Sequence, residues 1–463
     1  MSAAHAAAQL ERRPASPLRF AISPRAPAPP SEAFMKFRLF AKTLAIVMLA
    51  FALGATAVAA DKKPPEYPNA KRESPKPDLT SRHDEELLKK GFAALNDSKQ
   101  QTEAQTDLQK LVSDSSSKYA KAEALRGLAQ LKVNQNDYAG GIALLKQALA
   151  LDSLPNDDYF DTMMGLAQLY TQNQQWQPAL DTLKTWMEQG GKQTGDAYAL
   201  QGRIYLSEKE YSDAVSSMQQ AMKLQPQGAP VWWGQVLVES YVGLKDYAHA
   251  AQVLETQLAA NPSDATTRKN LVAVYLDANQ PAKALQAMED AKAHGLIVTG
   301  TDYINLAKMY VIVGQDSNDP KPDAQKAVAA LQEGFAKQVV QPSFDSYKLL
   351  GDASYLAGDL HGAVAAWGKA APFATDGKLD MQRGQLMVQQ LDQYRDGRAA
   401  LQQALAKGGL EKPGVAWILI GNADIKLKDK AGALAAYRKA AQYPETKSAA
   451  VKWLKAESHG GRK

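Results

Sequence analysis

The sequence contains no cysteine among its 463 residues. This absence excludes disulfide bonds, thiolate zinc sites, iron–sulfur clusters, cysteine nucleophiles and a lipidated N-terminal cysteine. Histidine is also scarce, and His83, His249, His294 and His361 are scattered without the paired spacing of metal ligands. We therefore expect no metal site and no cofactor.

An excess of charge of one sign is missing from most of the chain. The formal net charge is +5, and residues 1–60, with seven basic and two acidic residues, account for all of it. Residues 61–463 hold 47 basic and 47 acidic residues. A body without net charge gives no electrostatic reason to bind nucleic acid, so we expect no nucleic-acid partner.

A leader begins at Met35. Lys36, Arg38 and Lys42 precede an apolar run at 44–58 and a stretch of small residues, an order typical of a secretory signal peptide. We predict a signal peptide at 35–60, cleaved after Ala59 or Ala60, and export to the periplasm. An uncleaved leader that tethers the chain to the inner membrane remains open, although the run is shorter than the ~20 residues of a spanning helix.

The segments on either side of the leader lack the pattern of a folded core. Residues 1–34 are rich in alanine and proline, show no periodicity and precede a methionine that opens the signal peptide, so we interpret them as an over-extended gene start. Residues 61–82 combine five prolines with many charges, a composition that favours extended conformations and cannot bury a core. We predict that 61–82 is a tether, that 83–457 is the folded body and that 458–463 is a tail.

The folded body repeats one pattern nine times. One unit has a small residue, an aromatic three positions later, a small residue nine after that, and then a large residue, a small residue and proline: Gly202, Tyr205, Ala214, Met218, Ala221 and Pro226. The first positions of the nine units are 34 to 44 residues apart: Ala129, Ala167, Gly202, Val238, Val272, Ala307, Gly351, Gln385 and Gly421. This spacing is typical of tetratricopeptide repeats, in which each unit is a helix–turn–helix.

The repeat predicts the fold class. We expect an all-α tetratricopeptide-repeat superhelical solenoid of nine to ten hairpins, with turns at 136–137, 209–210 and 358–359 and the first helices on the concave face. A degenerate tenth unit is expected at 84–114, and a C-terminal capping helix at 446–457.

Motifs for catalysis or ion binding are incomplete. Residues 314–323 partly resemble a calcium loop, but Pro320 and the missing glycine and distal glutamate break the EF-hand pattern, so a solvated turn fits better. Residues 190–195 lack the spacing of a phosphate loop and fit a connection between units. With no nucleophile motif and no expected sheet, we predict that the protein is not an enzyme.

The remaining candidates are side chains that the repeat register places in the groove. They mix aromatic and charged groups: Arg203, Trp232, Gln235, Glu239, Lys269, Lys308, Lys348, Asp352 and Tyr355. Adjacent Trp232 and Trp233 point about 100° apart on a helix, so the register predicts that Trp232 faces the groove. The alternative is that both pack between units. Arg126 and Gln130 occupy positions where a carboxylate clamp needs lysine and asparagine, so such a clamp is not expected.

Two segments carry a more specific resemblance. The runs LAQLYTQNQQWQPALDTLKTWMEQG (166–190) and ALAKGGLEKPGVAWILIGNADIKLKDKAGALAAYRKAAQYPETKSAAVKWL (404–454) resemble periplasmic tetratricopeptide proteins described as components of the TonB system. The resemblance extends from about 85 to 455. It implies a scaffold that works beside TonB, ExbB, ExbD or the outer-membrane receptors they energise, and it transfers no catalytic residue. The alternative is a general assembly scaffold for outer-membrane or cell-wall proteins.

Overall fold

The computed structural model describes residues 64–95 and 99–460. The predicted gene start at 1–34 and signal peptide at 35–60 lie outside the described residues. Within them the chain forms 21 α-helices and no strand, and none of these helices is long and apolar enough to cross a membrane. The chain divides into two compact units between Gln257 and Leu258, and each unit is described by itself below.

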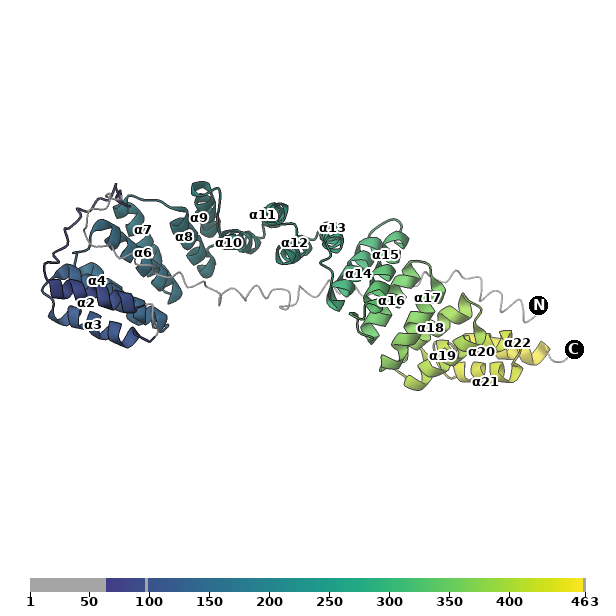
Figure 1. The fold of residues 1–463 in the computed structure, drawn as a ribbon. Helices are drawn as coiled ribbons and strands as arrows, with labels where there is room; N and C mark the ends of the chain where they lie inside the picture. The colour runs from purple at the N-terminus through teal and green to yellow at the C-terminus, as the bar shows by residue number, and fades with distance from the viewer. Residues whose placement is uncertain (1–63, 96–98, 461–463) are drawn as a thin grey trace. The chain divides into compact units, whose positions relative to one another are not determined.

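The first unit consists of successive antiparallel hairpins, drawn from purple to teal in Figure 1. Its helices are α2 Arg82–Ala94, α3 Gln101–Asp114, α4 Lys118–Asn134, α5 Tyr138–Ala150, α6 Asn156–Gln172, α7 Trp176–Gly190, α8 Gly195–Glu208, α9 Tyr211–Leu224, α10 Val231–Gly243 and α11 Tyr247–Ala260. The last of these crosses the division between the units. The pair α2 and α3 confirms the degenerate unit expected at 84–114.

The second unit continues the same arrangement. Its helices are α12 Ala265–Asp277, α13 Pro281–Ala293, α14 Gly300–Gln315, α15 Lys321–Ala336, α16 Phe344–Leu356, α17 Leu360–Ala370, α18 Lys378–Gln389, α19 Tyr394–Lys407, α20 Pro413–Lys426, α21 Lys430–Ala440 and α22 Lys447–Gly460, with a 3₁₀ turn at Ala371–Phe373. The described helices therefore form ten hairpins followed by α22, as the repeat predicts. Residues 458–460, predicted as tail, instead extend α22.

One turn geometry joins the helices in eight of the described hairpins. A residue with positive φ lies two positions before the second helix, at Asn136, Gln174, Lys209, Lys245, Asn279, Gly358, Asp392 and Lys428. Lys209, for example, has a φ of 65°, and the N–H of the next residue, Glu210, donates to the carbonyl of Tyr205 over 2.9 Å. This left-handed closure ends the first helix and reverses the chain. The three turns expected from the sequence are all of this kind.

Small residues at the first repeat position let the two helices of a hairpin approach closely. A Cβ on Gly202 would lie 2.7 Å from Met218 Sδ, and a Cβ on Gly351 would lie 2.2 Å from Trp367 Cδ1. Ala214, at the second small position, is completely buried. A larger residue at any of these positions would overpack the crossing at a cost of roughly 1–3 kcal/mol.

The long step of 44 residues in the sequence belongs to the hairpin of α14 and α15. Both helices have 16 residues, and the turn at 316–320 lacks the positive-φ residue of the other hairpins. In this turn the Ser317 hydroxyl donates to the carbonyls of Gly314 and Asp319 over 2.7 and 2.8 Å. The extra residues therefore lengthen the helices and form a hydrogen-bonded turn.

The structure differs from the sequence prediction in the segment 64–81, which we call the strap. Tyr67 is only 5% exposed and packs with Phe160 and Trp186 in a core cluster of the first unit. The prediction that this composition cannot contribute to a core is wrong for Tyr67. The physical reason is that α6 and α7 supply the core, so one buried aromatic side chain suffices to hold an otherwise polar segment against it.

Polar contacts hold the rest of the strap. Arg72 donates to Asp152 over 2.7 Å and to Asn156 Oδ1 over 2.9 Å, and its guanidinium lies 4.2 Å from the ring centre of Tyr159. Asp78 accepts hydrogen bonds from the first backbone N–H groups of α4 and from the Ser117 hydroxyl. A carboxylate at this place satisfies N–H groups that the helix leaves unpaired. The described strap is therefore part of the first unit.

Candidate functional site

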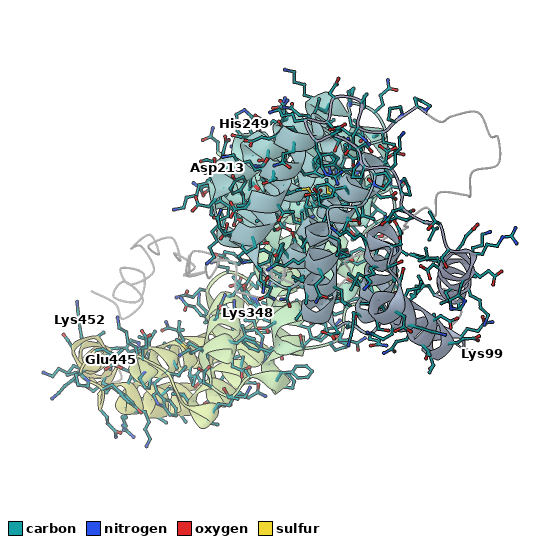
Figure 2. All side chains as sticks on the ribbon, turned by 90° about the vertical axis from the view of Figure 1, so that its left-hand side faces the viewer. Lys99, Asp213, His249, Lys348, Glu445 and Lys452 are labelled. Carbon is teal, nitrogen blue, oxygen red and sulfur yellow. The ribbon has the colours of Figure 1, made fainter. Side chains whose placement is uncertain are left out.

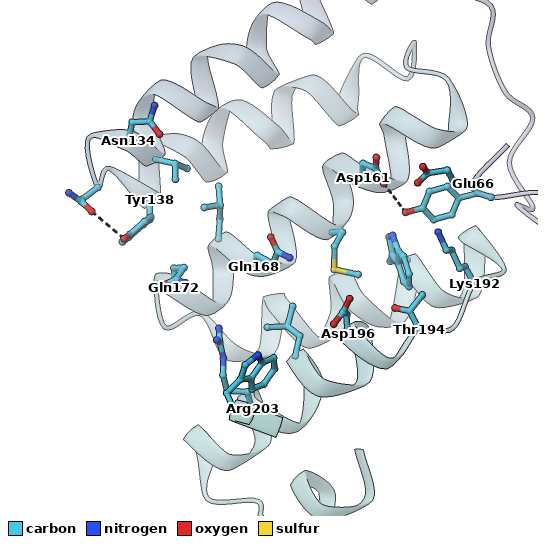
Figure 3. Close-up of a pocket in the computed structure, with 18 residues that line it drawn as sticks. Glu66, Asn134, Tyr138, Asp161, Gln168, Gln172, Lys192, Thr194, Asp196 and Arg203 are labelled. Atoms are coloured by element: carbon cyan, nitrogen blue, oxygen red, sulfur yellow. Dashed lines mark hydrogen bonds between the residues drawn. The ribbon is translucent and has the colours of Figure 1, made fainter. Parts of the chain in front are cut away.

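A pocket of about 580 Å³ opens in the first unit (Figure 3). It is lined mainly by the first helices of four consecutive hairpins, α4, α6, α8 and α10, with the strap at one end. The largest contribution comes from α6, whose lining residues recur at the spacing of one helix face: Asp161, Met164, Gln168, Leu169 and Gln172. The repeat thus brings side chains about 35 residues apart in sequence to one surface.

Arg203 and Trp232 lie together at one end of the pocket. The guanidinium carbon of Arg203 is 5.8 Å from the ring centre of Trp232, within range of a cation–π interaction. Partial burial lowers the pKa of Arg203 from its ordinary value, although the group stays charged at neutral pH. No carboxylate among the described residues is paired with this guanidinium.

The carboxylates of the pocket lie toward its opposite end. Figure 3 shows Glu66 and Asp161 near Lys192, and Asp196 between Lys192 and Arg203. The Tyr67 hydroxyl donates to Asp161 over 2.9 Å, and the ammonium of Lys192 lies 4.5 Å from the centre of the Tyr67 ring. Partial burial and the like charge of Glu66 raise the pKa of Asp161 against the lowering effect of the tyrosine.

The two tryptophans differ as the register predicts. Trp233 is completely buried, whereas Trp232 is half-buried and lines the pocket. Their rings meet edge to face with centres 6.1 Å apart. The buried ring of Trp233 therefore packs against the half-exposed ring of Trp232.

The other predicted groove residues of α10 lie outside the pocket. Gln235 and Glu239 are half-buried on the same helix face as Trp232, at intervals of three and seven residues. Burial raises the pKa of the Glu239 carboxyl to about 7. Among the groove candidates in the described residues, Glu239 is therefore the one whose charge changes near neutral pH.

The groove candidates of the second unit differ in exposure. Lys269 and Lys308 are exposed on α12 and α14. Lys348, labelled in Figure 2, and Tyr355 lie half-buried on α16.

The repeat register assigns Asp352 to the groove, and the structure shows that it is buried instead. It is only 6% exposed, accepts a hydrogen bond of 3.0 Å from the indole N–H of Trp367 and pairs with Lys348. Tyr355 stacks on the same indole with ring centres 5.9 Å apart. Because buried Trp367 needs an acceptor for its N–H, Asp352 serves the core and leaves no free carboxylate in a groove.

Arg126 and Gln130, at the positions of a carboxylate clamp, are also core residues. Arg126 is 2% exposed and donates to Glu123 over 2.6 Å and to Asp158 over 2.9 Å. The Gln130 amide donates to Asn134 over 2.9 Å. Both side chains are therefore buried and hydrogen-bonded within the first unit.

Several pocket residues were not among the sequence candidates. Tyr67, Asp161 and Lys192 lie at its strap end, and Gln168 and Gln172 line it from α6. The register could have indicated Gln168 and Gln172, because they occupy on α6 the positions that Arg203 and its neighbours occupy on α8. Nothing in the repeat points to Tyr67, which precedes the first unit.

The described residues contain no cluster of three or more histidine, aspartate or glutamate side chains placed to hold a metal ion. The pocket presents a half-exposed tryptophan, the amides of Gln168 and Gln172, the guanidinium of Arg203 at one end, and carboxylates with Lys192 toward the other. Such a surface can bind a polypeptide through aromatic contacts, hydrogen bonds and ion pairs.

Two family models match the chain. Residues 384–446 match the tetratricopeptide repeat, and residues 72–274 match the C-terminal ARM domain of tetratricopeptide repeat protein 21. None of the curated proteins compared with this sequence is significantly similar to it.

Solved structures with similar helical repeats have low identity. A tetratricopeptide repeat protein from Parabacteroides merdae is 13% identical over 66% of this chain and 99% of its own, with a TM-score of 0.38. The C-terminal part of a repeat protein from Cytophaga hutchinsonii is 16% identical over 53% and 94%, with a TM-score of 0.39. MamA from Desulfovibrio magneticus is 21% identical over 39% and 96%, with a TM-score of 0.30.

TM-scores this low do not establish a shared overall arrangement. The assignment instead rests on the ten described hairpins, their common turn and the two family models. Together these observations show that the chain is built of tetratricopeptide-type repeats.

Proposed function

We propose that this chain is a non-enzymatic scaffold that binds a segment of a partner protein in the pocket of its first unit. The observation that carries the proposal is the half-exposed Trp232 with Arg203 against it, at a surface built by four consecutive hairpins. Tryptophan and arginine are the residue types that most often dominate the energy of protein interfaces. The repeat fold supports a scaffold because its hairpins form an extended surface for binding.

We further propose that the scaffold acts in the periplasm as an accessory of TonB, ExbB and ExbD, which energise outer-membrane receptors. The predicted signal peptide at 35–60 supports export. The resemblance of 166–190 and 404–454 to periplasmic proteins of the TonB system supports the choice of partners.

The experiment is affinity capture of the tagged full chain from cells treated with a protein crosslinker. Recovery of TonB, ExbB, ExbD or a dependent receptor with the natural protein, and its loss with Trp232→Ala, is the expected result. Recovery of outer-membrane assembly or cell-wall proteins would instead favour the general envelope scaffold. Equal recovery with the natural chain and Trp232→Ala would contradict a role for the pocket.

A further inference from the structure

The polarity of the pocket points to the kind of segment it binds. The two ends differ in net charge: the three lining carboxylates, Glu66, Asp161 and Asp196, lie on the strap side of Arg203 and outnumber the one cation there, Lys192, while Arg203 has no carboxylate partner among the described residues (Figure 3). A half-buried guanidinium without a counterion is stabilised by an anion that arrives with the ligand.

The distance between Asp196 and Arg203 can be estimated from α8. Asp196 and Arg203 are seven residues apart on this helix, with Leu200 between them in the lining. Seven residues of an α-helix span about 10 Å. An extended peptide covers that distance with about three residues. One short segment can therefore reach both charged ends at once.

The α6 wall of the pocket suits a peptide backbone. The side-chain amides of Gln168 and Gln172 belong to this wall, and neither is hydrogen-bonded to another residue in the part of the chain that the structure describes. A primary amide both donates and accepts hydrogen bonds, so it can pair with either group of a peptide unit. Trp232 and Leu200 offer apolar contact beside these amides.

We propose that the pocket binds an extended peptide segment that carries an acidic side chain for Arg203 and, about three residues away, a basic side chain for Asp196, beside Asp161. The strap is then part of the recognition surface, because Tyr67 lines the pocket and donates its hydrogen bond to Asp161. This proposal rests on the proposed function, since it names the chemistry of the partner segment.

The test is a titration of the full chain with fluorescent 12-residue peptides, acetylated and amidated so that their ends carry no charge. In a background of serine, threonine and alanine, the set has aspartate and lysine three residues apart in either order, aspartate alone, lysine alone, and neither. We expect one of the two-charge peptides to bind roughly tenfold more tightly than the neutral peptide, with the gain falling as salt rises.

Variants assign the two ends. Arg203→Gln should remove the gain from aspartate and Arg203→Lys should keep part of it, while Asp196→Asn should reduce the gain from lysine. The matched control is Lys184→Gln, an exposed cation on α7 outside the pocket lining, which should change no affinity. Thermal unfolding of each variant shows that a loss of binding is not a loss of fold.

The outcomes separate this proposal from the function on which it rests. If no peptide binds, or if the charged peptides bind no better than the neutral one, the charge complementarity is wrong. The scaffold function survives that result if a photoreactive side chain in the pocket still captures a partner in cells. If Arg203→Gln leaves the preference for aspartate unchanged, Arg203 is not the anion site and the proposal is overturned.

Discussion

The hydroxyl of Tyr67 donates a hydrogen bond of 2.9 Å to Asp161, although the two residues are 94 positions apart. Tyr67 belongs to the strap and Asp161 to α6, so this contact joins a polar segment before the repeats to the wall of the pocket. The tyrosine ring lies 4.9 Å from that of Phe160 and 5.8 Å from that of Trp186. The strap is therefore anchored by packing and aligned by one hydrogen bond.

Removal of the Tyr67 ring should release the strap. Tyr67→Ala deletes a buried aromatic side chain, for which we expect a loss of roughly 3–5 kcal/mol of local stability. Hydrogen exchange should become faster for the amides of 64–81 and of α6. Tyr67→Phe keeps the packing and loses one hydrogen bond, so it should cost only about 1 kcal/mol. Similar exchange rates in Tyr67→Ala and the natural protein would show that the strap is not anchored there.

Substitution of the two adjacent tryptophans should have different effects on stability and on binding. Trp233→Ala leaves a cavity in the core and should cost roughly 3–5 kcal/mol in urea-induced unfolding. Trp232→Ala removes a half-buried ring and should cost about 1 kcal/mol, mainly its contact with Arg203, while abolishing partner binding. If the two variants lost equal stability, both tryptophans would be core residues and Trp232 would be no anchor.

The stability of the first unit should depend strongly on keeping both partners of the buried ion pair between Arg126 and Glu123. Arg126→Leu leaves Glu123, whose side chain is 7% exposed, without its guanidinium, so it should destabilise the first unit by roughly 3–5 kcal/mol. The double variant Glu123→Leu with Arg126→Leu removes the stranded carboxylate and should regain at least half of that loss. Chemical unfolding of the two variants measures the difference. A double variant less stable than Arg126→Leu would contradict this account.

Glu239 makes stability depend on pH. Burial raises the pKa of its carboxyl from an ordinary 4.5 to about 7 in the folded protein, so the folded state holds the proton more tightly than the unfolded chain does. As the pH rises from 4.5 through 7, the carboxyl therefore increasingly opposes folding. Glu239→Gln mimics the neutral acid and should stabilise the protein by roughly 1–3 kcal/mol at about pH 8 and hardly at all near pH 4.5.

The measurement is urea-induced unfolding of Glu239→Gln and of the natural chain at both pH values. The comparison between the two proteins cancels the other titrating groups. A gain in stability that is the same at both pH values would show that the carboxyl is not titrating between them.

The repeat fold was predictable because its signal is local and recurs. Small residues such as Gly202 and Ala214 appear at fixed positions, and each reports a close helix crossing that the structure contains. The turns were predictable for the same reason, since a polar or glycine residue recurs where the backbone takes a positive φ. The register also separated Trp232 from Trp233.

The sequence predictions were wrong where the burial of a side chain depends on one specific contact that the repeat pattern does not encode. Tyr67 is buried because α6 and α7 leave room for it, and no period in the sequence reports that space. Asp352 followed the groove register but binds the N–H of Trp367, where other units have aliphatic or smaller residues. A tryptophan at a core position could have signalled that a nearby polar side chain would be its acceptor.

The central claim, that the pocket of the first unit binds a polypeptide, is tested most directly by a photoreactive amino acid at Gln168 in living cells. The matched control is the same amino acid at exposed Lys184 on α7, outside the pocket lining. Our account predicts that the Gln168 position crosslinks to one envelope protein through a defined peptide, that Lys184 does not, and that Trp232→Ala abolishes the crosslink. Equal labelling from both positions, or a crosslink from Gln168 that persists with Trp232→Ala, would contradict it.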